Sequence, residues 1–511
     1  MSNRTQKGLK NSYVALIYYV LSILLGFISR KVFIVHLGAD LLGLNTTAQN
    51  LLGFLNLAEL GIGSAIAFTL YRPLAVNDKP QVNEIVTVQG WLYKKIANVV
   101  VVGAVILSCF FPWIFANTGL PLWYAYASFG VYLYSSLLTY YVNFKQIVLS
   151  ANQEEYKITY SYKFVLLFQL LFQIIAISYF PHPYLWWLVI QFTFSSIAAI
   201  SLNRVIRRDY PYLRIKLSEG KALSRKYPII IKKVKQLFVH KISGFVLTQT
   251  SPLIIYAYTT LRDVALYGNY MLIINNVTYM FTSVFNGVTA GVGNLVAEGD
   301  NKKIMNLFQE LFSARFFLAT IFIFTLYKMI DPFIVLWLGE DFVMSKSTLI
   351  VMLGIMYIMM TRTTIDAYIS AYGLYQDIYA PVIEACLNLG LSILLGMFYG
   401  ITGILSGSLI SMIIIVLLWK PYFVFTRAFK EKLTVYVNMY LKHISCFIVS
   451  AMVASFLLNY LLITPTNFLY WAIDALIVVV VFALILFMSM MLFTTGMGFF
   501  YKRVLFITKR K

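Results

Sequence analysis

Charged side chains interrupt several stretches of the chain that are otherwise apolar enough to lie in lipid. Arg30, Glu59 and Arg315 each lie deep within such a stretch, and Arg362 stands one helical turn before Asp366, close enough to pair. A charge near the centre of a bilayer costs at least about 2.5–3.5 kcal/mol. A guanidinium group binds phosphate through charge-assisted hydrogen bonds, and a buried carboxylate can exchange a proton. We therefore expect these side chains to face a hydrated cavity whose cations attract anions.

Polar side chains also recur every three or four residues in two of the apolar stretches. Between residues 43 and 70 the pattern comprises Asn45, Gln49, Asn56 and Glu59, and between residues 264 and 296 it comprises Asn269, Asn276, Tyr279, Ser283 and Asn286. This spacing places the polar groups on one face of a helix. Such a face turns toward protein or water, because lipid leaves its hydrogen bonds unmet. The pattern predicts that Asn45, Gln49, Asn56, Asn276 and Tyr279 line the cavity.

Other interpretations remain open for some of these residues. Arg362 and Asp366 could form an ion pair with a purely structural role. Tyr368 could stack on the face of a sugar, or it could belong to the aromatic belt at a membrane interface. Glu384 and Asp474 lie near the ends of apolar stretches, so we expect them to reach an interface.

The composition indicates the environment in which these residues work. The chain has 511 residues, of which 60% are hydrophobic and 12% charged, and its mean hydropathy is +0.77. Soluble proteins are about 25% charged. About fourteen apolar runs are near the length of about 20 residues that spans a bilayer. They lie near residues 12–36, 43–70, 91–116, 121–150, 157–180, 183–203, 236–258, 264–296, 305–330, 345–371, 377–398, 401–426, 438–462 and 467–494. The sequence therefore predicts an all-α integral membrane protein with about 14 transmembrane helices.

The positive charges are distributed unequally among the connections between these runs. One set of alternate connections holds about 26 Lys and Arg, whereas the opposite set holds about one, Arg262. This asymmetry predicts that both termini lie in the cytoplasm and that the number of spans is even. It also accounts for most of the net charge of +21 without a nucleic-acid partner. The basic stretch 204–235 could in addition bind anionic lipid headgroups.

The same basic stretch divides the chain into parts. Residues 1–203 would form an N-terminal lobe of six helices, 204–235 a cytoplasmic loop, and 236–426 a second lobe of six helices. Residues 427–511 would add two helices and a basic tail. A similar order of helix, Gly-Asn helix start and short Asp-Lys loop occurs in both lobes, which predicts an internal repeat. Repeats of this kind form a site near the middle of the membrane.

Sequence patterns of several enzyme classes are missing from the chain. It contains neither G-x-x-x-x-G-K-[ST] nor H-E-x-x-H. Its four histidines lack the spacing of metal ligands, and its three cysteines all lie in apolar runs. A membrane polymerase or glycosyltransferase usually has a sizeable periplasmic loop, but the outer connections here are short. We therefore expect a protein that is not an enzyme and that needs no metal or organic cofactor.

Two long segments resemble a known family. They are RKVFIVHLGADLLGLNTTAQNLLGFLNLAELGIGSAIAFTLYRPLA, residues 30–75, and AYGLYQDIYAPVIEACLNLGLSILLGMFYGITGILSGSLIS, residues 371–411. Both are similar to bacterial polysaccharide flippases of the Wzx type, which translocate O-antigen and capsule repeat units. These flippases belong to the multidrug/oligosaccharidyl-lipid/polysaccharide exporter superfamily, together with multidrug extruders and lipid II flippases.

The resemblance implies a fold and a function. Members have two six-helix lobes arranged as a V, two added helices, and a cavity that opens alternately to the two sides of the inner membrane. Their cargo is an oligosaccharide linked to undecaprenyl diphosphate, and a polysaccharide polymerase and a chain-length regulator are expected partners besides membrane lipids. The resemblance implies a cationic cavity, in which Arg30, Arg315 and Arg362 would bind substrate. The drug extruders instead place acidic residues in the cavity for H⁺ or Na⁺ coupling, so Glu59 and Asp366 keep a cation-coupled antiporter open as the alternative. A polymerase is the less favoured one.

Overall fold

The computed structural model describes residues 3–509 except 60, 117, 286–291, 294, 297, 375–376, 378 and 463–464. Within these residues every regular element is helical. Nine of the described helical segments are long and apolar enough to cross a membrane. The prediction of an all-α integral membrane protein is therefore confirmed.

The nine segments reproduce most of the predicted apolar runs. They are Gln6–Leu37, Lys79–Cys109, Glu155–Tyr179, Pro183–Asp209, Asn301–Leu338, Lys346–Ala371, Tyr379–Phe429, Leu433–Leu461 and Phe468–Phe493. The segment Tyr379–Phe429 has 51 residues and contains two predicted runs. These two meet at Gly400, whose φ of 54° bends the helix there. The remaining predicted runs fall on helices that are interrupted, shorter or less apolar, and part of the run 264–296 lies outside the described residues.

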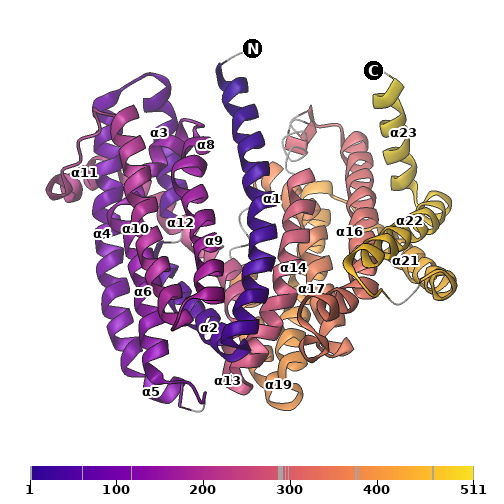
Figure 1. Cartoon of the computed structure of the whole chain (residues 1–511). Helices are drawn as coiled ribbons and strands as arrows, with labels where there is room; N and C mark the ends of the chain where they lie inside the picture. Colours follow the sequence, from indigo (N-terminus) through magenta and orange to yellow (C-terminus); the bar gives the residue numbers. More distant parts are fainter. Residues whose placement is uncertain are drawn as a thin grey trace. The chain divides into compact units, whose positions relative to one another are not determined.

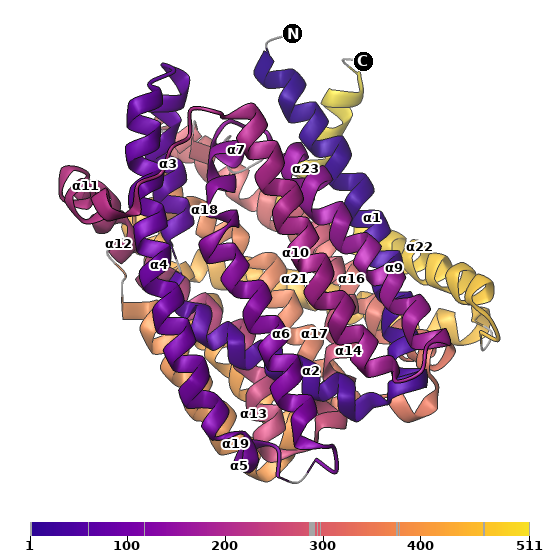
Figure 2. The same cartoon turned by 60° about the vertical axis from the view of Figure 1, so that its left-hand side comes forward.

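The chain divides into two compact units, Met1–Ala265 and Leu266–Lys511. The first unit contains α1 (Asn3–Leu37), α2 (Ala39–Leu55), α3 (Ile62–Ala75), α4 (Lys79–Cys109), α5 (Phe111–Ile114), α6 (Leu122–Tyr141), α7 (Ile147–Ala151), α8 (Glu155–Ile158), α9 (Phe164–Tyr179), α10 (Pro183–Asp209), α11 (Gly220–Lys226), α12 (Pro228–Gln249) and α13 (Ser251–Tyr258). In this unit α6 packs on α2, α4 and α10, while α9 packs on α1 and α10 (Figures 1 and 2). Their apolar faces form one continuous core.

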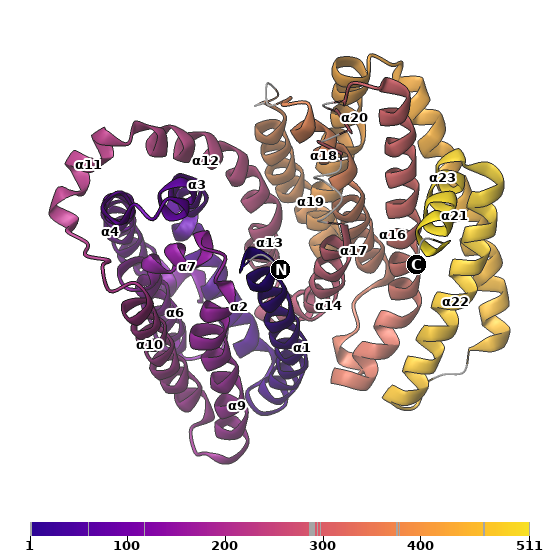
Figure 3. The ribbon, with the colours of Figure 1, turned by 90° about the horizontal axis from the view of Figure 1, so that it is seen from above.

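The basic stretch and the two helices after it belong to the first unit. Helix α11 packs on α4, α12 packs on α3, and α13 packs on α2, as Figure 3 shows for α11 and α12. The division between units therefore falls after α13, whereas the sequence analysis began the second lobe at residue 236. Tertiary contacts decide which helices pack together across a connection of this length. Sequence periodicity carries no information about these contacts.

The second unit is built around one long helix. Its helices are α14 (Leu261–Phe285, which begins in the first unit), α16 (Asn301–Leu338), α17 (Lys346–Thr361), α18 (Thr363–Ala371), α19 (Tyr379–Met412), α20 (Lys420–Val424), α21 (Leu433–Leu461), α22 (Phe468–Phe493) and α23 (Thr495–Lys509). Helix α16 packs on α17, α22 and α23, and α19 packs on α17 (Figure 3). The core of this unit is rich in aromatic rings, among them Phe308, Phe312 and Phe316 of α16.

The second predicted run is interrupted in the middle. Helix α2 ends at Leu55, a 3₁₀ turn covers Asn56–Glu59, and α3 starts after Gly61, whose φ is 94°. Glycine tolerates this left-handed backbone because it has no Cβ. An interruption at membrane depth leaves main-chain groups without helical partners, so it is tolerated where protein or water surrounds it. The break carries two of the predicted site residues, Asn56 and Glu59.

A cluster of polar groups joins three elements of the first unit. The carboxylate of Glu154, which is 7% exposed, lies 2.8 Å from the Nζ atoms of both Lys7 and Lys157. The hydroxyl of Tyr210 donates to the same carboxylate at 3.0 Å. Burial by itself raises the pKa of Glu154, but the hydrogen bonds from Lys157, Lys7 and Tyr210 outweigh it and lower the pKa. The cluster thus fixes the start of α1 to the segment before α8 and to the end of α10.

The Glu154→Gln variant should be less stable. It removes the carboxylate that Lys7 and Lys157 share, while Lys157 keeps its contact with Asp209 at 2.8 Å, so we expect the free energy of unfolding to fall by about 2 kcal/mol. Because the pKa of Glu154 is lowered in the folded state, its stabilisation is complete above the ordinary carboxyl pKa of about 4.3 and disappears as the pH falls through the folded value. Denaturation of the purified protein at several pH values measures the difference between wild type and variant.

The neighbouring Glu155 provides the control. It is exposed, so Glu155→Gln should leave stability nearly unchanged. Equal stability of Glu154→Gln and wild type at neutral pH would show that the cluster does not hold these elements together.

Candidate functional site

The second unit brings together two cations around one carboxylate. Asp366 of α18 accepts a hydrogen bond from Arg362 Nε at 3.1 Å and another from Lys420 Nζ at 2.7 Å. The pairing of Arg362 with Asp366, one turn apart, is therefore confirmed. Lys420, from α20, was not singled out from the sequence, although it is the one charged residue in the predicted run 401–426. Asp366 thus connects two elements that are far apart in the chain.

Arg315 approaches the same region from the middle of α16. It is 2% exposed, and its guanidinium carbon lies 4.9 Å from the centre of the Phe285 ring. One terminal nitrogen donates to Thr364 Oγ1 at 3.1 Å. Within the part of the chain that the structure describes, Arg315 Nε has no hydrogen-bond partner. A buried guanidinium with an unused donor can bind an additional acceptor at low cost, because the donor is already desolvated.

Arg315 and Asp366 line one small cavity of the second unit. Its volume is about 210 Å³, and its lining consists of Thr282, Phe285, Arg315, Thr363, Asp366, Ala367 and Ser370. This volume lies below the range of about 300–1,000 Å³ that buries drug-sized ligands. The cavity therefore suits water or one phosphate-sized group rather than a whole oligosaccharide.

A further carboxylate lies close to these charges. Glu384 of α19 is 2% exposed and lies within electrostatic range of Arg362, Lys420 and Asp366. The expectation that Glu384 and Asp474 reach an interface is wrong, since protein covers both side chains. Even with Glu384 ionised, three cations face two carboxylates in this region. The cluster therefore has an excess of positive charge that attracts anions.

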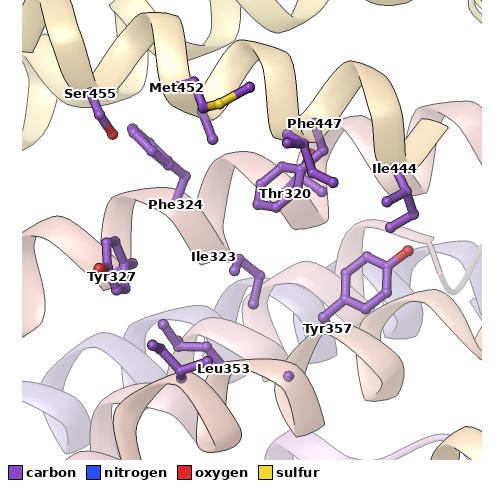
Figure 4. A pocket seen from close by; sticks show the side chains of 14 residues that line it. Thr320, Ile323, Phe324, Tyr327, Leu353, Tyr357, Ile444, Phe447, Met452 and Ser455 are labelled. Atoms are coloured by element: carbon purple, nitrogen blue, oxygen red, sulfur yellow. The ribbon is translucent and has the colours of Figure 1, made fainter. Parts of the chain in front are cut away.

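A second cavity of the same unit has a different character. It has a volume of about 730 Å³ and lies between α16, α17 and α21. Figure 4 shows side chains of the three helices around it, for example Phe324, Leu353 and Met452. Its lining contains hydroxyl groups but no charged side chain. It therefore provides a surface for apolar groups and no site for phosphate.

In the first unit, most of the predicted polar residues bond to neighbouring helices. Asn45 Oδ1 accepts a hydrogen bond from Tyr184 at 2.8 Å. Asn56 Oδ1 accepts two, from Ser136 at 3.0 Å and from Tyr140 at 2.8 Å. These bonds join α2 and the turn after it to α6 and α10, so the polar face turns toward protein, as required at membrane depth.

The remaining predicted residues of this unit differ in their hydrogen-bond partners and in their exposure. Glu59 accepts a hydrogen bond from Tyr93 at 2.9 Å, and the ring of Tyr93 contacts that of Tyr140, which places Glu59 in the same network as Asn56. Arg30 donates to the carbonyl of Ala265 at 3.1 Å and is partly buried. Gln49 is exposed.

The aromatic and amide residues predicted in the second unit are not gathered at one place. Asn276 donates to the carbonyl of Leu272 in its own helix at 2.8 Å, and Tyr279 is 60% exposed. Asn286, from the same predicted pattern, lies outside the described residues. Tyr368 is fully buried, and its hydroxyl donates to the carbonyl of Ile304 at 3.3 Å.

The position of Tyr368 differs from its interpretation as a residue that stacks on sugars. Its ring packs against Phe308 and Phe429 in the aromatic core, so protein covers both of its faces. The structure thus gives Tyr368 a packing role, and sequence spacing could not distinguish this from a cavity role. Among the described residues, no group of three or more His, Cys, Asp or Glu side chains could hold a metal ion.

The fold is shared with solved membrane proteins. No model of a protein family and no curated protein sequence matches the chain. The lipid II flippase MurJ in an inward closed conformation aligns with a TM-score of 0.63 at 13% identity, covering 94% of this chain and 99% of that one. An inward-facing multidrug resistance MATE family transporter of the MOP superfamily aligns with a TM-score of 0.57 at 12% identity, covering 80% and 95%. At such identities the likeness concerns the fold alone.

A double-mutant cycle should detect the pairing of Asp366 with Lys420. We expect the destabilisations caused by Asp366→Asn and Lys420→Met to be non-additive by about 1 kcal/mol, since each variant removes the same 2.7 Å contact. Combining Asp366→Asn with Lys432→Met, which changes an exposed lysine at the start of α21, should be additive within about 0.5 kcal/mol. Denaturation of the six proteins in detergent (wild type, the three single variants and the two double variants) measures both cycles, and an additive Asp366–Lys420 cycle would contradict the geometry.

Proposed function

We propose that this chain is a flippase for lipid-linked oligosaccharides. Its cargo would be a repeat unit attached to undecaprenyl diphosphate, moved by alternating access from the cytoplasmic to the periplasmic face of the bacterial inner membrane for surface polysaccharide biosynthesis. The observation that carries the proposal is Arg315, a buried arginine with an unused donor beside a phosphate-sized cavity. The fold shared with a lipid II flippase is compatible with this function.

The chemistry of the cargo matches these residues. A diphosphate carries about two negative charges, which hydrocarbon rejects, and arginine side chains bind phosphate oxygens through paired hydrogen bonds. Arg315 and Arg362 would bind the diphosphate in the second unit, and Arg30 is a candidate substrate-binding residue of the first unit. The amides of Asn45, Gln49, Asn56 and Asn276 and the exposed Tyr279 would replace water around sugar hydroxyl groups.

The charge balance favours this cargo over a cationic drug. In a cation antiporter, an acidic residue of the cavity must be free to bind the cationic substrate. Asp366 is already paired with Arg362 and Lys420, so a drug cation would have to displace one of them. A phosphate would instead add an anion to a region in which three cations face two carboxylates.

Transport against a gradient needs an energy source. We propose coupling to H⁺ or Na⁺ through Glu59 and Asp366, both of which accept hydrogen bonds from groups that could exchange partners during the cycle. Further parts of the proposal are cytoplasmic termini and association with a polysaccharide polymerase and a chain-length regulator. The excess of Lys and Arg on one set of connections supports the orientation.

Export should depend on the arginines of the second unit. In a host whose own copy is deleted, we expect Arg315→Lys and Arg362→Ala to lower export of the repeat unit about tenfold or more, since each loses charged hydrogen bonds worth about 1.5–3 kcal/mol. Surface glycan and cytoplasmic lipid-linked repeat unit are measured together with the amount of protein in the membrane.

The exposed Arg427 supplies the control, because among the described residues it neither lines the Arg315 cavity nor pairs with Asp366, so Arg427→Ala should export normally. Normal surface glycan in both Arg315→Lys and Arg362→Ala would remove these residues from the binding site. Loss of drug tolerance on deletion, without accumulation of lipid-linked sugar, would support the antiporter instead.

The orientation can be tested independently. A fluorescent protein that matures only in the cytoplasm should be bright when fused to the C-terminus, whereas alkaline phosphatase, which needs the periplasm, should be inactive there. The reverse result would contradict the proposed orientation.

A further inference from the structure

A third cavity of the second unit combines cations with apolar walls. It has a volume of about 750 Å³ and lies between the first turns of α16 and the terminal helix α23, which Figure 3 shows beside each other. Its lining consists of Leu295, Lys303, Asn306, Leu307, Glu310, Phe499, Lys502, Arg503 and Phe506. The apolar cavity of Figure 4 has no such charges, and the Arg315 cavity is much smaller.

The two helices contribute matching faces to this cavity. Helix α16 provides Lys303, Asn306, Leu307 and Glu310, and α23 provides Phe499, Lys502, Arg503 and Phe506. Both sets follow the spacing i, i+3, i+4, i+7, which places each set on one side of its helix. The cavity is therefore formed by two continuous amphipathic faces rather than by scattered surface residues.

The walls are held in place by close packing next to the cavity. A Cβ atom at Gly496 would lie 2.2 Å from the carbonyl oxygen of Gln309, so the backbone of α23 approaches α16 more closely than any other residue type would allow. Thr495 donates to Gln309 Oε1 at 3.0 Å. Arg503 pairs with Glu310, whose side chain is 7% exposed. Two helices fixed in this way keep the cavity open between them.

The charges of the lining favour an anion. Lys303, Lys502 and Arg503 face a single lining carboxylate, that of Glu310. The side chains of Lys303 and Arg503 are 67% and 56% exposed, so their charged ends can reach a ligand at the mouth of the cavity. Lys303 also contacts the carboxylate of Asp300 at 3.3 Å, and a phosphate oxygen could take the place of this carboxylate beside Lys303.

We propose that this cavity binds an anionic phospholipid of the surrounding membrane. The headgroup phosphate would contact Lys303, Lys502 and Arg503, while an acyl chain would lie along Leu307, Phe499 and Phe506. A membrane lipid is the occupant that fits best, because α16 is a membrane span and the cavity lies at its first turns, where a headgroup and its chains meet. The bound lipid would hold α23 against α16. This site is separate from the Arg315 cavity and does not depend on the proposed transport function.

Lipid binding to the purified full chain tests the proposal. We measure by native mass spectrometry the affinity for phosphatidylglycerol and for phosphatidylcholine with identical acyl chains. The wild type should bind phosphatidylglycerol more tightly, and the double variant Lys303→Ala, Lys502→Ala should lose about tenfold or more of this affinity, because each lysine attracts the anionic headgroup. Both lysines are on the surface, so the double variant should fold.

Two further measurements separate a lipid from a free anion. Phe506→Ser should also weaken phosphatidylglycerol binding, since it removes part of the apolar wall, whereas Lys432→Ala, an exposed cation outside the cavity, should not. Unchanged affinity in the double lysine variant, equal binding of phosphatidylcholine, or full displacement of the lipid by excess inorganic phosphate would each overturn the proposal. None of these outcomes bears on transport, so a failure here leaves the proposed function in place.

Discussion

The constraint on which much of the second unit depends is the burial of charge in a membrane protein. Asp366 compensates two cations at once, Arg362 from its own helix and Lys420 from a helix far along the chain. An unpaired charge at this depth would cost several kcal/mol. The pairing therefore fixes α18 relative to α20. Arg315, by contrast, keeps its Nε donor without a hydrogen-bond partner among the described residues. Structure and binding chemistry thus come from the same charges.

In the first unit, hydroxyl groups donate to polar side chains of α2 and of the turn after it. Asn45 and Asn56 accept hydrogen bonds from tyrosines and a serine of neighbouring helices, and Glu59 accepts one from Tyr93. The interruption between α2 and α3 places two of these residues where the regular helix stops. Polar residues in a membrane protein can therefore stabilise helix packing and remain available to a substrate, provided that their partners can exchange.

Three cavities of the second unit differ in the charged side chains that line them. The Arg315 cavity is small and charged, the cavity of Figure 4 is large and has no charged group, and the cavity of α23 combines both characters. The Arg315 cavity therefore fits a phosphate, the cavity of Figure 4 fits an apolar chain, and the cavity beside α23 fits a lipid with its headgroup and chains. Volume sets the Arg315 cavity apart from the other two, and charge distribution distinguishes the ligands of the two large cavities.

The sequence by itself determined that the chain is an all-α membrane protein, because composition and run length depend on no tertiary contact. It also determined the pairing of Arg362 with Asp366, since residues one turn apart in a helix are always neighbours. Only the tertiary structure decided that Lys420 joins this pair, that Glu384 is buried, and that Tyr368 belongs to the core. Helical periodicity shows which residues share a face, but the neighbour that covers this face comes from distant segments whose packing no local pattern encodes.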